Sequence, residues 1–251
     1  MSGYFPYYKN SCIAGRTKCL LCFHHAGGNA SVFLPLRRFD NEGFVTVAAE
    51  LPGHGRRVRE APITDLDLLI EQLAEETAEL FSGCELYLYG HSFGSIIAFE
   101  LCRKLEKDGI SPAALIVTGR NAPDETEPSP FRLEQGDEAL AAEMKRYGFI
   151  PDELLSDRDF MSCYLPMVKA DYMMIESYSF TQGSLISAPI YFSYGSEDPD
   201  LRCETADRWG LMTTGVFRKE VRSGGHFFVF EKGNTFFEDL IRNITGIKAD
   251  F

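Results

Sequence analysis

The sequence LYLYGHSFGS, residues 86–95, passes directly into IIAFEL, residues 96–101. The first four residues are a short apolar and aromatic run that predicts a buried strand, and the last six have the apolar content of a buried helix. Between them, Gly90-x-Ser92-x-Gly94 predicts a nucleophile elbow, a tight strand-to-helix turn that leaves no room for a Cβ on either side of the serine. The helix would point its N-terminal N–H groups at Ser92, where they favour a developing negative charge.

The elements around this turn predict a parallel sheet. An amphipathic pattern predicts a helix that begins at Thr64 or Asp65 and runs to about Phe81, just before the elbow strand. Strand–helix–strand order is typical of parallel βαβ units, so Ser92 is expected at the carboxyl edge of the sheet. The other predicted strands cover residues 18–23, 44–51, 113–118, 189–194 and 216–221, and a closing amphipathic helix covers 234–244.

The alternation of strand and helix stops between residues 124 and 186. Helices are predicted over residues 137–147, 152–155 and 157–178, with a break or kink near Leu165 because Pro166 cannot donate a helical hydrogen bond. The segment is rich in methionine and aromatic residues, which suit a flexible acyl chain. We therefore predict one domain over residues 1–251, with a lid insertion at about 124–186 that covers Ser92. A plain helical subdomain is the alternative.

Candidate partners of Ser92 follow two later strands. Asp198 comes just after the strand at residues 189–194, and Glu197 and Asp200 beside it are fallback candidates. His226 follows two glycines after the strand at residues 216–221, where a loop can deliver it to a serine on another strand. The order Ser92, Asp198, His226, with separations of 106 and 28 residues, is that of α/β-hydrolases. It predicts this fold: a mostly parallel central sheet flanked by helices, with a helical lid insertion.

These residue types have complementary roles in acyl transfer. A serine hydroxyl is a weak nucleophile, so His226 would take its proton as it attacks a carbonyl carbon, and Asp198 would orient the imidazole. The backbone N–H groups of Ala26 and Phe93 would bind the oxyanion, because a Gly-Gly loop after a buried strand lets amides approach a ligand closely. We expect no proton transfer by the neighbouring His24 and His25, which would shape the loop.

Bulk properties exclude several classes of function. The chain has 251 residues, 45% of them hydrophobic, and a net charge of −12, which argues against nucleic acid and anionic membranes as partners. The N-terminus has no signal pattern, and the seven cysteines are scattered, so we expect a cytoplasmic protein with reduced thiols. Cys19-x-x-Cys22 has no second ligand pair at metal spacing. The chemistry above needs no metal or cofactor.

Several motifs together resemble one family. The sequence is similar to the stand-alone type II thioesterases that accompany nonribosomal peptide and polyketide synthases, from about Lys18 to Ile244. The oxyanion loop departs from the family pattern at His24, where a proline is usual. The motifs that carry the resemblance are residues 23–31, 51–55, 90–94, 165–172, 176–178 and 224–226.

The resemblance implies a substrate and a partner. The substrate would be an acyl or aminoacyl thioester on the phosphopantetheine arm of an acyl or peptidyl carrier protein domain, and the reaction would remove aberrant or stalled groups. The arm belongs to the partner, so no cofactor of the enzyme itself is implied, and we expect a monomer. The alternatives are a chain-releasing thioesterase or acyltransferase, another serine acyl hydrolase, and a catalytically inactive binding protein on the same fold.

Overall fold

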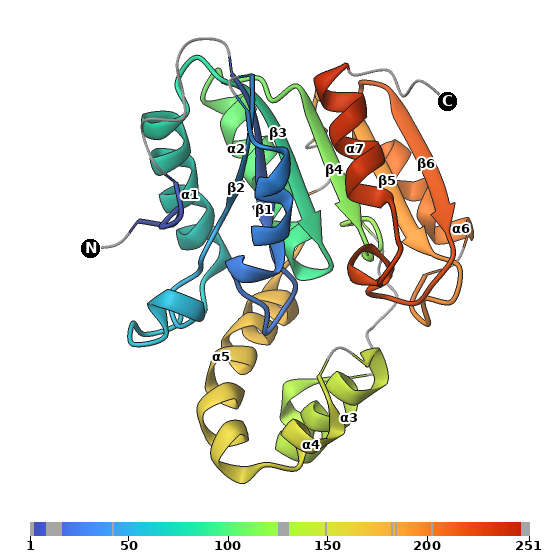
Figure 1. The fold of residues 1–251 in the computed structure, drawn as a ribbon. Helices are drawn as coiled ribbons and strands as arrows, with labels where there is room; N and C mark the ends of the chain where they lie inside the picture. Colours follow the sequence, from blue (N-terminus) through green and yellow to red (C-terminus); the bar gives the residue numbers. More distant parts are fainter. Residues whose placement is uncertain are drawn as a thin grey trace.

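A parallel sheet forms the centre of the molecule. The computed structural model describes residues 3–8, 17–41, 43–124, 131–148, 150–181, 183, 185–201 and 203–246. Within these residues six strands are ordered β2-β1-β3-β4-β5-β6, and every neighbouring pair is parallel (Figure 1). The strands are β1 (Lys18–Phe23), β2 (Phe44–Ala48), β3 (Glu85–His91), β4 (Ala114–Thr118), β5 (Ile190–Gly195) and β6 (Phe217–Arg222). The predicted parallel sheet is confirmed, with small shifts at the strand ends.

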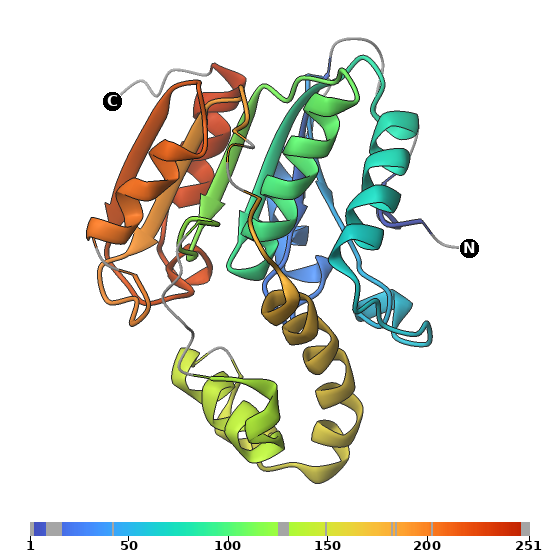
Figure 2. The ribbon, with the colours of Figure 1, turned by 180° about the vertical axis from the view of Figure 1, so that it is seen from behind.

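Helices cover both faces of the sheet (Figures 1 and 2). The helices α1 (Leu66–Leu80) and α2 (Phe93–Lys107) pack on one face together with the short segments α6 (Cys203–Ala206) and η5 (Asp207–Leu211). The 3-10 segment η2 (Ala30–Phe39) and the closing helix α7 (Phe236–Thr245) pack on the other face. The short 3-10 segments η3 (Gly55–Arg57) and η6 (Phe228–Phe230) lie in the loops after β2 and β6.

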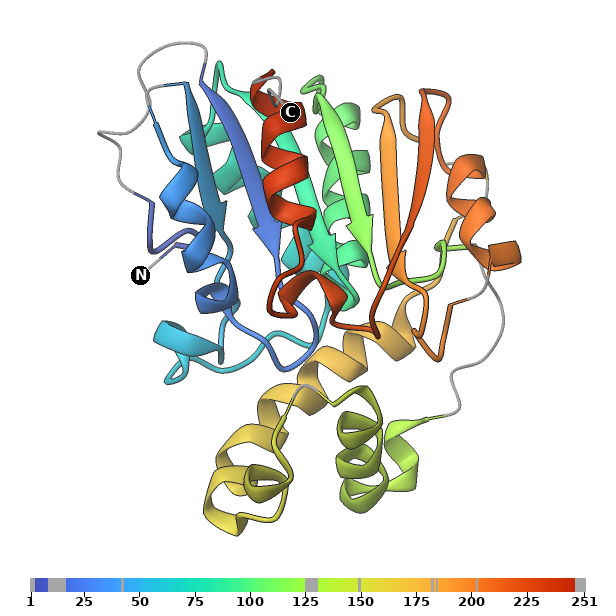
Figure 3. The same ribbon diagram turned by 45° about the vertical axis from the view of Figure 1, so that its right-hand side comes forward.

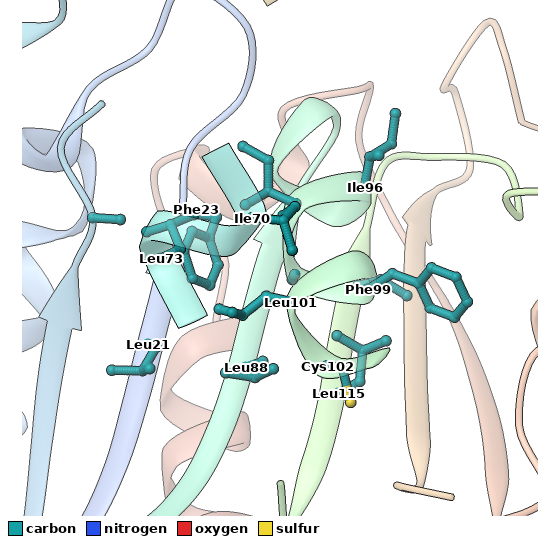
Figure 4. Close-up of a cluster of buried hydrophobic side chains, with 14 of the residues drawn as sticks. Leu21, Phe23, Ile70, Leu73, Leu88, Ile96, Phe99, Leu101, Cys102 and Leu115 are labelled. Atoms are coloured by element: carbon teal, nitrogen blue, oxygen red, sulfur yellow. The ribbon is translucent and has the colours of Figure 1, made fainter. Parts of the chain in front are cut away.

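Alternate side chains of the strands serve the two faces. Leu21 and Phe23 of β1 belong to the cluster under α1 and α2, whereas Leu20 and Cys22 belong to the cluster under η2 and α7. This alternation is the period of a strand buried on both sides. Figure 4 shows the first cluster, in which Leu21, Leu88 and Leu115 of three neighbouring strands lie beneath side chains of α2.

The segment between β4 and β5 contains η4 (Leu133–Gln135) and the helices α3 (Asp137–Tyr147), α4 (Asp152–Leu155) and α5 (Arg158–Ser177). We call residues 131–181 the helical insertion. It lies beyond the ends to which the strands point, which is the edge where β3 delivers Ser92 (Figures 1 and 3). The insertion has its own small apolar core, which includes Phe131, Leu140 and Met161. Its motion as a lid remains a prediction.

One local prediction was wrong. The helix α5 continues from Arg158 to Ser177 through Pro166, so the predicted break does not occur. Pro166 is exposed, and the helix is fixed to the rest of the molecule on both sides of it, so loss of one hydrogen bond is tolerated. Asn29 caps η2, because its side chain accepts the Ser31 N–H at 2.9 Å.

None of the described helices is long and apolar enough to cross a membrane. Cys19 and Cys22 are buried as free thiols, on opposite faces of β1.

Candidate active site

The turn between β3 and α2 holds Ser92 in a strained conformation. Ser92 has φ +55° and ψ −116°, and no other non-glycine residue of the described chain has a positive φ. The turn is held by the Ser92 N–H, which donates to Thr118 O at 2.8 Å, and by the Ser95 hydroxyl, which reaches Gly90 O at 2.9 Å. Backbone strain of this kind persists only where surrounding contacts fix it, and it is concentrated at functional sites.

Both glycines of the motif are required by close backbone approaches. A Cβ added to Gly90 would lie 2.1 Å from Gly94 O, and one added to Gly94 would lie 2.1 Å from Phe23 O. The second contact joins the elbow to the end of β1, directly before the loop that carries Ala26. The Gly-x-Ser-x-Gly pattern is therefore explained by packing between two neighbouring strand ends.

Asp198 and His226 meet at the same edge of the sheet. The His226 Nδ1–H donates to Asp198 Oδ2 at 2.8 Å, and both side chains are buried. This bond leaves Nε2 of the imidazole available on the other side of the ring. Glu197 is exposed, and Asp200 bonds to other groups, so neither fallback acid occupies this position.

Ser92 and His226 line one small cavity of about 40 Å³. No hydrogen bond joins the two side chains in the described structure, and such bonds are often long in unliganded enzymes and tighten when substrate binds. His25, Ala26 and Phe227 complete the side of the cavity next to the sheet. The helical insertion supplies the opposite wall, with Met144, Tyr147, Ile150, Tyr164, Val168 and Tyr172.

This wall differs from the predicted methionine-rich surface. Met144 is the methionine of the insertion that lines the cavity, whereas Met161 lies in the core of the insertion and Met174 in the core of the sheet. Three tyrosines take their place, so the wall is stiffer and more polar than the composition suggested.

The loop after β1 leaves the Ala26 amide without a partner in the described part of the chain. The Ala26 carbonyl accepts a hydrogen bond from His25 Nδ1 at 2.9 Å, the Gly27 N–H donates to Asp171 at 2.8 Å, and the Gly27 carbonyl accepts from Tyr164 at 2.8 Å. Among the described residues the Ala26 N–H has no acceptor, and neither has the Phe93 N–H at the start of α2. Two unused amides beside Ser92 are the geometry that an oxyanion hole needs.

The helix α5 fixes this loop through a buried ion pair that the sequence analysis did not assign. The Asp171 side chain is fully buried, and its Oδ2 accepts hydrogen bonds from the Gly27 N–H and from His54 Nε2 at 3.0 Å. The other ring nitrogen of His54 lies 3.0 Å from Pro52 O, which can only accept, so both nitrogens donate. Burial alone would lower the pKa of His54, but the Asp171 carboxylate outweighs it and the pKa is raised above 6.5. His54 is buried, and through Pro52 it also holds its own turn.

The other histidines near the site are neutral. Burial, with the charge of His54, lowers the pKa of His24 to about 3, and burial also lowers that of His25 to about 4. Burial and the nearby imidazole of His226 hold the pKa of His91 well below 6.5. His24 and His25 both hydrogen-bond through Nδ1 to backbone carbonyls, as expected of residues that shape the loop.

A larger hollow of about 560 Å³ lies elsewhere, on α1 and α2, with Leu185 at its edge. It is lined mostly by charged side chains such as Glu71, Arg103 and Lys107, and it contains neither Ser92 nor His226. The small cavity is therefore the candidate active site, because the strained serine and the Asp198–His226 pair meet there.

Comparison with known proteins identifies the family. A family model described as "Thioesterase domain" matches residues 18–247. The chain belongs to the thioesterase-domain family. The thioesterase is similar to "Gramicidin S biosynthesis protein GrsT" of Aneurinibacillus migulanus, at 30% identity over 92% of this chain and 90% of the relative. It is 33% identical to the "Probable cadicidin biosynthesis thioesterase" of Streptomyces griseus over 84% of its own length, and spans 58% of that relative.

A solved structure supports the fold. The type II thioesterase BorB from the borrelidin biosynthetic cluster superposes with a TM-score of 0.80, at 29% identity over 92% of this chain and 95% of BorB. With the parallel sheet and the elbow, this shows that the thioesterase has the α/β-hydrolase fold.

Sequence motifs outside the elbow position the helical insertion of the thioesterase. Glu176 accepts the Leu133 N–H at 2.6 Å, and the Tyr178 hydroxyl donates to Glu100 of α2 at 2.6 Å. Glu176, Tyr178 and Asp171 lie in the stretches 165–172 and 176–178 that carry the family resemblance. Their residue types did not by themselves indicate a role. Tyr147 and Tyr164, which line the cavity, had no signal beyond the aromatic content of the segment.

Proposed function

We propose that the protein is a serine thioesterase that hydrolyses acyl or aminoacyl thioesters from the phosphopantetheine arm of carrier protein domains, and so removes aberrant or stalled groups in nonribosomal peptide or polyketide biosynthesis. The observation that carries the proposal is the strained Ser92, which lines one cavity with His226, the imidazole that is hydrogen-bonded to Asp198. The biosynthetic names of the relatives, and of BorB as a type II thioesterase, support the choice of substrate.

The proposed reaction proceeds in two halves. Ser92 Oγ attacks the thioester carbonyl carbon while His226 Nε2 takes its proton, and the amides of Ala26 and Phe93 bind the oxyanion. Collapse of the intermediate breaks the carbon–sulfur bond, and His226 returns the proton to the leaving thiolate. Water then attacks the acyl-serine, His226 accepts its proton, and release of the acid restores the serine hydroxyl. Asp198 orients and stabilises the imidazolium in both halves.

The test compares the enzyme with Ser92→Ala on carrier proteins loaded with acetyl, aminoacyl and long acyl groups, and on the matching free pantetheine thioesters. We expect the enzyme to hydrolyse at least one class of loaded carrier, and we expect the rate with that carrier to be at least about 10³-fold lower in the variant, as for loss of an activated nucleophile. The free acid is the expected product.

Two results would contradict the proposal. Unchanged turnover in Ser92→Ala would remove the serine mechanism. Transfer of the acyl group to an added amine or alcohol in place of water, measured by mass spectrometry of the products, would favour an acyltransferase.

A further inference from the structure

Tyr147 covers the imidazole of His226. It is the last residue of α3, and its ring lies 4.4 Å from the His226 ring, measured between centroids, with 38° between the planes. Tyr147 also lines the cavity that contains Ser92. One side chain of the helical insertion therefore forms the cavity wall next to the proposed base.

The ring is held in place by Asp200. The Tyr147 hydroxyl donates to Asp200 Oδ2, and Arg146 binds both oxygens of the same carboxylate at 2.7 and 3.1 Å. Burial and the Asp200 charge raise the pKa of Tyr147 above 10, so the hydroxyl stays protonated and acts as donor. Burial alone would raise the pKa of Asp200, but the bonds from Arg146 and Tyr147 lower it, so this carboxylate is ionised at neutral pH.

Asp200, which anchors Tyr147, lies in the same loop as Asp198. The Asp200 N–H donates to Asp198 Oδ1 at 3.0 Å, while Asp198 Oδ2 accepts from His226. The position of the Tyr147 ring is thus fixed with respect to the Asp198–His226 pair. The guanidinium of Arg146 lies 4.5 Å from the centre of the Tyr147 ring and adds a cation–π contact.

The cavity that remains is small. Its volume is about 40 Å³. The carbonyl group of a thioester at Ser92 takes up part of this space. The longer the acyl chain, the more the wall has to move to admit it, and Tyr147 is the wall residue that touches His226.

We propose that Tyr147, anchored by Asp200, determines the size of the acyl group that reaches Ser92 and restricts the enzyme to short acyl thioesters. This inference rests on the proposed function, since it concerns the thioester bound at that site. Removal of the ring opens the wall. Removal of the hydroxyl alone leaves the ring in place but frees it to swing away from His226.

The experiment measures kcat/KM with acetyl-, butyryl- and octanoyl-pantetheine thioesters. The ratio of octanoyl to acetyl is the readout, because a ratio within one variant does not depend on the fraction of active protein. We expect this ratio to be well below one in the enzyme and to rise at least tenfold in Tyr147→Ala. Tyr147→Phe is expected to raise it by a smaller factor. Leu154→Ala, an exposed change on α4, is the control and should leave it unchanged.

Asp200→Asn tests the anchor. It removes the charge that binds Arg146 while the backbone N–H to Asp198 stays, and the ratio should shift as in Tyr147→Phe. Asp200→Asn and Tyr147→Phe release the same ring, so their effects on the ratio should not add in the variant that carries both changes. Additive shifts would overturn the role of Asp200.

An octanoyl-to-acetyl ratio in Tyr147→Ala within twofold of that of the unaltered enzyme would overturn the proposal, and so would equal rates for all three chains in the unaltered enzyme. Both results differ from failure of the proposed function. If the proposed function fails, either the unaltered enzyme hydrolyses no thioester, or Ser92→Ala hydrolyses thioesters as fast as the unaltered enzyme.

Discussion

At the level of single residues, the backbone of Ser92 is strained where its side chain reaches the cavity. A non-glycine residue at φ +55° is less stable by about 1–3 kcal/mol than in a relaxed conformation. Its N–H to Thr118 O, and the Ser95 hydroxyl to Gly90 O and Thr118 O, hold it there. The strain directs the hydroxyl to the cavity, at the N-terminus of α2.

Gly94→Ala should be severely destabilising. The added Cβ would lie 2.1 Å from Phe23 O and 2.8 Å from His24 O, and backbone atoms at the end of a central strand cannot move aside cheaply. We expect the free energy of unfolding to fall by more than about 3 kcal/mol, or the protein to be insoluble. Urea denaturation measures this change.

Gly43→Ala is the matched control, because its Cβ would meet only Asn41 Oδ1 at 3.6 Å. A change of less than about 1 kcal/mol is expected there. Equal losses in the two variants would show that close approach is not the reason for glycine at position 94.

Residue-level prediction from sequence works where local geometry dictates the residue type. The elbow demands glycines on both sides of Ser92, and that demand is visible in the sequence. Asp171 and Tyr147 carry no such mark, because the loop or ring that each contacts lies far along the chain. Their positions follow only from the packing of the insertion on the sheet.

At the scale of elements, α5 is both part of the insertion and a support of the proposed oxyanion loop. Tyr164 and Asp171 are seven residues apart, about two turns, and both bond to Gly27. Movement of this part of α5 would therefore disturb the amides beside Ser92. If the insertion acts as a lid, this part of α5 has to stay in place for those amides to keep their positions.

Asp171→Ala should cost roughly 2–4 kcal/mol of stability, because it leaves the Gly27 N–H and Nε2 of His54 without their partner in a buried site. Thermal and urea unfolding measure the loss. Lys169 lies on the same helix as Asp171. Lys169→Ala removes an exposed ion pair with Asp137 and should change stability by less than about 1 kcal/mol. A loss of less than about 1 kcal/mol in Asp171→Ala would contradict the role of the Asp171 side chain in holding the loop.

Strands and helices were predictable from sequence where a clear hydrophobic pattern was not overridden by tertiary contacts. The ranges of β1, α3 and α4 agree with the sequence analysis to the residue, since apolar runs and periodicity define them. Pro166 misled because the rule that proline breaks helices takes no account of contacts that hold the helix on either side.

At the scale of the whole molecule, all five histidines of the chain are buried at the carboxyl edge of the sheet. Their rings form a nearly continuous series, with 5.0 Å between His54 and His24, 6.2 Å between His25 and His91, and 5.3 Å between His91 and His226. The stability of the fold is therefore coupled to pH at the same edge that carries the candidate active site.

The direction of this coupling follows from the pKa shifts. The pKa values of His24, His25 and His91 are lowered, so below pH 6.5 the unfolded chain binds protons that the folded protein does not, and stability falls as the solution becomes more acidic. The pKa of His54 is raised, so its ion pair with Asp171 stabilises the fold fully below pH 6.5 and loses that effect as pH rises through the raised pKa. Stability should therefore decline on both sides of neutral pH.

Two conservative substitutions separate these effects. At pH 5, a histidine whose pKa falls from 6.5 to about 3 lowers stability by about 2 kcal/mol relative to neutral pH. His24→Asn keeps a donor near Nδ1 but does not titrate, so unfolding free energies between pH 7 and 5 should fall by about 2 kcal/mol less than in the unaltered protein. His54→Gln keeps a donor near Nε2 for Asp171 and should flatten only the alkaline decline. If both variants kept the pH profile of the unaltered protein, the acid sensitivity would have to arise from carboxylates, and the buried imidazoles would not control it.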